Sequence, residues 1–125
     1  MENLERLKRV RDLLLKLHKL LIDRERGKWE DANGPLNSSQ FLNLLLENDD
    51  LAWLRKFSML IVEIDEMFAL KDGITTEMID ASLQKAAELV EMGGPDLRFN
   101  EQFLHALQEE TAVSGLRSEL RSALS

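Results

Sequence analysis

Four carboxylates in the middle of the chain form the pattern with the clearest potential for chemistry. Glu63 and Glu66 are three residues apart, and so are Glu77 and Asp80. Residues at this spacing lie on one face of a helix, and a helical hairpin that turns near Gly73 would bring the two pairs together. Carboxylate oxygens converging from two elements suit a hard cation such as Mg²⁺. The pattern therefore allows a metal site made of these four side chains.

This Glu-x-x-Glu and Glu-x-x-Asp arrangement resembles that of the all-α nucleoside-triphosphate pyrophosphohydrolases of the MazG type. The resemblance implies Mg²⁺ held by carboxylates of neighbouring helices, with water attacking the phosphates that the metal grips. Ten residues separate Glu66 from Glu77, which is shorter than the usual spacing in that family, and Val62 rather than a second Glu precedes Glu63. The helix dipole alone also favours an acid in the first turn, where Glu77 is expected. The other interpretation is a solvated acidic edge, with Glu63 pairing with an Arg or Lys of the first helix.

Other residues with chemical potential are sparse. The chain has no Cys, which excludes disulfides, thiolate metal sites and cysteine nucleophiles. Neither His18 nor His105 has a second histidine at helical spacing, and Glu101 stands four residues before His105, not the three of a di-iron motif. The chain has no Gly-x-Ser-x-Gly and no phosphate-binding loop. We expect no cofactor and no catalytic residue, and the sequence favours a protein that is not an enzyme without deciding the point.

The charge is negative and uneven. The net charge is −7, yet residues 1–30 carry nine Lys or Arg and six Asp or Glu, so the excess of acids lies in residues 31–125. An acidic body repels nucleic acid and anionic membranes, and apolar runs of about four residues are too short to span a bilayer. The first residues mix acids with bases, unlike a signal peptide. We expect no nucleic-acid or membrane partner and a cytoplasmic location.

The composition predicts an all-α fold. The chain has 25 Leu but only nine Val or Ile and no Tyr, which favours helices over strands. Apolar periodicity and turn residues place helices at residues 3–32, 38–48, 51–70 and 76–92, with two more starting near residues 100 and 111. The last two could instead form one bent helix. We expect residues 1–125 to form a single domain, a compact bundle of five to six helices with a long N-terminal helix.

The local signals also predict helix ends and burial. Asn37 with Gln40 forms a capping box, and Thr75 is a good cap for the helix at residues 76–92. The helix at residues 51–70 is the most apolar and is expected at the centre of the bundle. The segment 38–48 is expected to be well buried because it carries five large apolar residues: Phe41, Leu42, Leu44, Leu45 and Leu46.

The first helix suggests association. A helix of about 30 residues is about 45 Å long, whereas a globule of this size is about 36 Å across. One apolar stripe on this helix contains Leu7, Val10, Leu14, Leu17 and Leu21. We expect this stripe to form the interface of a homodimer or to bind another protein. The alternative is that the later helices cover the first helix entirely, or that it breaks at Gly27.

Trp29 lies in a polar stretch of the same helix and is either an interface anchor or a lid over the end of the second helix. The predicted function is therefore a protein–protein association module that self-associates through its N-terminal helix. The alternative is a Mg²⁺-dependent all-α nucleotide phosphohydrolase with an acidic site between the third and fourth helices.

Overall fold

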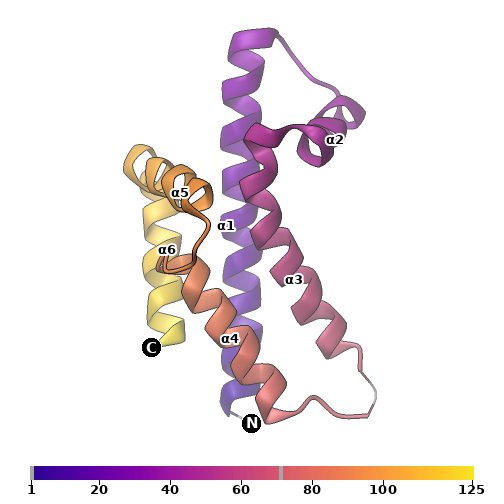
Figure 1. Ribbon diagram of the computed structural model, residues 1–125, viewed down its shortest axis with the longest axis vertical. Coiled ribbons are helices and arrows are strands. Elements are labelled where there is room, and N and C mark those ends of the chain that lie inside the picture. The colour runs from indigo at the N-terminus through magenta and orange to yellow at the C-terminus, as the bar shows by residue number, and fades with distance from the viewer. Residues whose placement is uncertain (1, 71) are drawn as a thin grey trace.

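The computed structural model describes residues 2–70 and 72–125, which form helices and no strand (Figure 1). This confirms the all-α fold with a long N-terminal helix, and the C-terminal region is two helices rather than one. The elements are α1 (Glu2–Asn33), α2 (Ser38–Glu47), the 3₁₀ helix η1 (Asp49–Leu54), α3 (Arg55–Phe68), α4 (Thr76–Val90), α5 (Leu97–Glu109) and α6 (Thr111–Leu124). None of these helices is both long and apolar enough to cross a membrane.

The central helix is α1, which corrects the prediction that the segment 51–70 would take that place. Helices α3, α4 and α6 all pack on α1. Arg11 of α1 donates two hydrogen bonds to the carboxylate of Asp65 on α3, at 2.8 and 3.0 Å. The physical reason is that α1 carries a continuous stripe of buried apolar residues between positions 7 and 21 and is long enough for several helices to pack along it.

A 3₁₀ turn replaces the expected start of the third helix. Residues 49–54 form η1, and α-helical winding begins only at Arg55. The side chain of Asn48 accepts a hydrogen bond from the backbone N–H of Asp50 at 2.8 Å. Short polar side chains such as Asn and Asp compete with helical bonding in this way, so the chain turns tightly between α2 and α3.

Four aromatic rings fix α5 against η1 and α3. The ring centroids of Phe57 and Phe103 are 5.4 Å apart, with the rings nearly perpendicular, and Phe99 lies 5.4 Å from Phe57 and 6.2 Å from Trp53. All four residues are buried. Edge-to-face and tilted contacts of this kind add to the stabilisation from apolar burial.

The predicted helix starts are confirmed where a side-chain cap marks them. Asn37 and Gln40 exchange hydrogen bonds of 2.8 and 3.0 Å in the capping box of α2, and Thr75 accepts from the N–H of Met78. Helix α5 begins at Leu97, three residues before the expected start, because Asp96 accepts a hydrogen bond from the N–H of Phe99. That bond lowers the pKa of Asp96.

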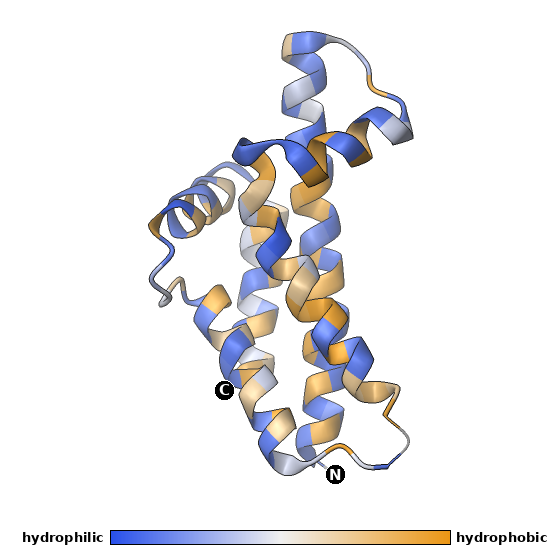
Figure 2. Ribbon diagram, turned by 45° about the vertical axis from the view of Figure 1, so that its right-hand side comes forward, coloured by the Kyte–Doolittle hydropathy of each residue, from blue (hydrophilic) through white to orange (hydrophobic). Residues whose placement is uncertain are grey.

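One end of α1 projects from the bundle. The helix is continuous through Gly27 and has 32 residues, so it is about 48 Å long. In Figure 1 its C-terminal end rises above α3 to α6, with α2 hanging beside it. Figure 2 shows that this end is mostly hydrophilic, while apolar residues recur along the covered part of α1.

Candidate association surface

The apolar stripe predicted as an interface lies in the core of its own chain. Its five residues, Leu7, Val10, Leu14, Leu17 and Leu21, have no exposed surface. The helices α3, α4 and α6 lie over α1 and account for this burial. The stripe is therefore closed to a partner in this fold, which corrects the premise that the chain cannot cover its own first helix.

Trp29 is the one predicted interface residue that is not in the core. It is half-buried on the projecting end of α1, where it lines a cleft of about 480 Å³ between α1 and α2. The other lining residues are Leu36, Gln40, Asn43, Leu44, Glu47 and Asn48. The cleft thus combines an indole ring and two leucines with several polar side chains.

Helix α2 is much less buried than its sequence predicts. Of its five large apolar residues only Phe41 is buried, while Leu42 and Leu46 are 56% and 62% exposed. These two leucines are four residues apart and therefore lie one turn apart on the same flank of α2. The prediction of a well-buried second helix was wrong because α2 packs mainly on the short η1 rather than between two long helices.

The projecting end of α1 and the helix α2 are tied together by Arg26 and Glu30. Arg26 donates to the carbonyl of Leu36 at 2.7 Å, and its guanidinium lies 5.1 Å from the centroid of the Phe41 ring. Glu30 accepts from the N–H of Leu36, also at 2.7 Å. We call residues 26–33 of α1 together with α2 the arm. Its contacts make the arm a defined unit rather than two loose segments.

The acidic pairs do not form a metal site. Glu63 is paired with Lys85 of α4 at 3.0 Å, not with a basic residue of the first helix as the solvated-edge interpretation expected. Glu66 lines a hollow together with Glu63 and Lys85, but Asp80 accepts a hydrogen bond from Asn3 of α1 and Glu77 lies in the exposed first turn of α4. Over residues 2–70 and 72–125, no group of three or more His, Asp or Glu could hold a metal ion. The geometry gives the phosphohydrolase alternative no support.

A buried ionic group between α1 and α5 escaped the sequence analysis. The side chain of Arg24 is 5% exposed and donates to Glu25 and to Glu109, both at 2.6 Å. Its Nε is buried without a hydrogen-bond partner. The hydrogen bond from Arg24 lowers the pKa of Glu109. No local signal identifies this contact, since Arg24 and Glu109 are 85 positions apart.

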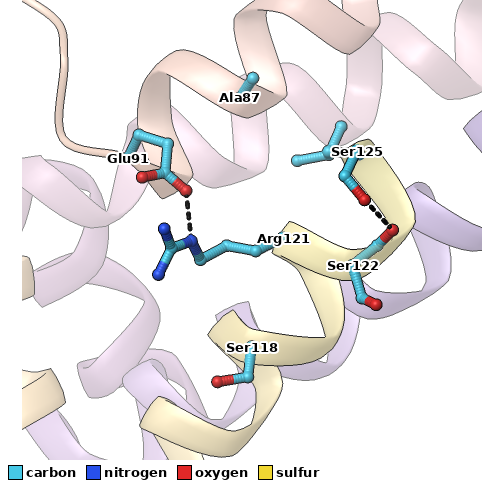
Figure 3. Close-up of a pocket in the computed structure, with 7 residues that line it drawn as sticks. Ala87, Glu91, Ser118, Arg121, Ser122 and Ser125 are labelled. Atoms are coloured by element: carbon cyan, nitrogen blue, oxygen red, sulfur yellow. Dashed lines mark hydrogen bonds and ion pairs between the residues drawn. The ribbon is translucent and has the colours of Figure 1, made fainter.

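A second hollow lies between the C-terminal turns of α4 and α6 (Figure 3). Glu91 and Arg121 form an ion pair of 2.6 Å at its edge, and Ser118, Ser122 and Ser125 also line it. The carboxylate already neutralises the guanidinium, so the hollow presents no free cation to an anionic ligand.

Neither a known protein family nor a curated protein nor a solved structure matches this chain.

Proposed function

We propose that the protein is a self-association module and that two copies join through the arm. The observation that carries this proposal is the unpartnered flank of α2, where Leu42 and Leu46 are more than half exposed. Exposed apolar side chains that lie next to each other, rather than singly, mark surfaces that bind a partner. In this proposal Trp29 remains an interface residue, and the arm takes the place of the buried stripe of α1 as the rest of the interface.

A second copy is the partner that this geometry favours. The arm carries a projecting feature, the pair Leu42 and Leu46, and a hollow feature, the cleft beside Trp29. The two features occupy different flanks of α2, since Gln40, Asn43 and Glu47 line the cleft whereas Leu42 and Leu46 do not. A two-fold interface requires that one patch be complementary to itself. Two copies can satisfy this when each inserts its leucine pair at the other's cleft.

The test is the mass of the protein in solution. Sedimentation equilibrium between about 1 and 500 µM should show an approach to twice the chain mass of 14.4 kDa. The variant with Leu42→Gln and Leu46→Gln should remain a folded monomer over this range, because the exposed leucines contribute little to the fold of one chain. Leu97→Gln, at a residue that is 77% exposed on α5, is the matched control and should still associate.

Trp29 supplies an independent readout. In a Trp53→Phe variant Trp29 is the single remaining tryptophan, and its emission should shift to shorter wavelength as the protein associates and the indole loses water contact. A wild-type protein that stays at the mass of one chain would contradict the proposal. A double-leucine variant that associates as strongly as the wild type would contradict it too.

A further inference from the structure

Helices α3 and α4 form a shallow groove on the outside of the bundle, separate from the arm. They contact each other and run in opposite directions, with α3 to the right of α1 in Figure 1 and α4 crossing the lower part of α1. Two hollows of about 210 and 380 Å³ lie along this face. Both hollows share Glu63 and Lys85, whose ion pair crosses the groove between them. We call these two hollows together the hairpin groove.

The floor of the hairpin groove is apolar and rich in methionine. Met59 is 64% exposed and Leu70 is 50% exposed, and Met67, Met78 and Leu89 line the groove between them. Methionine side chains are flexible and polarisable, and surfaces built from them adapt to different apolar partners. The 14 residues of α3 give the groove a length of about 21 Å, which matches a helix of four turns.

The uncompensated charge along this groove is negative. Its two lysines are already neutralised, since Lys85 pairs with Glu63 and Lys56 pairs with Asp96. Glu66 and Glu88 line the two hollows, are exposed on α3 and α4, and form no ion pair with any residue in the described parts of the chain. An apolar floor with acidic edges complements an apolar helix face with basic edges.

We infer that the hairpin groove binds a cationic amphipathic helix of another protein. The helix places one apolar side chain in each hollow, about two turns apart, and its lysines or arginines meet Glu66 and Glu88. The Glu63–Lys85 pair is half exposed and therefore weak, so a basic residue of the partner can replace Lys85 beside Glu63. A second copy of this chain does not fit, because its exposed apolar helix, α2, has no Lys or Arg and ends in Glu47.

Anisotropy of a labelled peptide tests this inference without reference to the arm. The probe is a peptide of about 15 residues made of leucine and lysine, with the leucines on one helical face. The control peptide keeps the leucines and replaces every lysine by glutamate. We expect micromolar binding of the lysine peptide, at least about tenfold weaker binding of the glutamate peptide, and a loss of affinity as salt is added.

Protein variants separate binding in the groove from general attraction to an acidic surface. The variant with Met59→Gln and Leu70→Gln keeps the net charge unchanged and should weaken binding of the lysine peptide at least about tenfold. Glu66→Gln with Glu88→Gln should weaken binding of the lysine peptide several-fold, and the control Leu97→Gln should leave its affinity unchanged. Circular dichroism checks that each variant remains folded.

Three results would overturn the inference. The first is equal binding of the two peptides, and the second is an unchanged affinity in the folded Met59 and Leu70 variant. The third is a change in the solution mass of that variant, since this would show that a second copy covers the groove. None of these depends on the arm, whose own test is the mass of the Leu42 and Leu46 variant.

Discussion

The guanidinium of Arg24 joins two helices that are far apart in the sequence. It pairs with the buried Glu25 on α1 and with Glu109 on α5, whose side chain is more than half exposed. Because Arg24 and Glu25 are themselves buried, removal of either would leave an uncompensated charge. The sequence shows Arg24 only as one of nine basic residues in the first 30 positions. Which carboxylate it meets depends on the packing of α5, so the pattern of charges could not predict this contact.

His18 should make stability depend on pH in the neutral range. Burial lowers the pKa of His18 below its ordinary value of 6.5, so below that pH the unfolded chain binds a proton that the folded protein does not. The free energy of unfolding should therefore be highest above about pH 6.5, and it should fall as the pH drops toward the pKa of His18 in the folded protein.

Urea denaturation between about pH 7.5 and pH 5.5 measures this dependence. The variant His18→Gln should flatten it, while His105→Gln, which changes an exposed histidine, should retain it. An equally steep loss of stability in His18→Gln would contradict the assignment to His18.

At the scale of the helices, most ends follow from neighbouring residues. The capping box at Asn37 and the cap at Thr75 act over three positions, so they are visible in the sequence.

The end of α4 is different. Residues 93–95 predict a glycine stop, yet Met92 is the residue in the left-handed conformation, with φ of 56°. Gly93 then donates to the carbonyl of Glu88, and the helix ends two residues earlier than predicted.

The glycines provide a test of this local reasoning. Gly27 and Gly115 lie inside α1 and α6 with open space where a Cβ would be, whereas Gly73 has φ of 108°. Gly27→Ala and Gly115→Ala should each stabilise the protein by about 0.5–1 kcal/mol. Gly73→Ala should destabilise it by about 1 kcal/mol, because alanine is strained at positive φ. Chemical denaturation of the three variants checks the signs, and a loss of stability in both helix variants would contradict the expectation.

For the whole molecule, the decisive feature is that α1 is covered by its own chain. Leu14 has no exposed surface and lies in the same core cluster as the buried residues of α3, α4 and α6. Leu14→Ala should lower the free energy of unfolding by about 2–5 kcal/mol through loss of apolar burial and the cavity left behind.

The dependence of that loss on protein concentration distinguishes a core from an interface. Because the contacts of Leu14 lie within one chain, the difference between variant and wild type should be the same in dilute and concentrated protein. If the loss of unfolding free energy in Leu14→Ala changed markedly with protein concentration, the stripe would have to be a contact between two copies.

The sequence by itself determined that the chain is helical, where most helices begin and that the first helix is long. Those features depend on propensity, caps and periodicity, all of which act over a few neighbouring residues. Only the tertiary structure decided which leucines are covered. Leu14 and Leu42 are chemically the same, but α3, α4 and α6 close over the stripe on α1, whereas nothing within the described chain closes over the outer flank of α2. Burial is set by contacts between distant segments, and these contacts cover the stripe on α1 but leave Leu42 and Leu46 of the arm exposed.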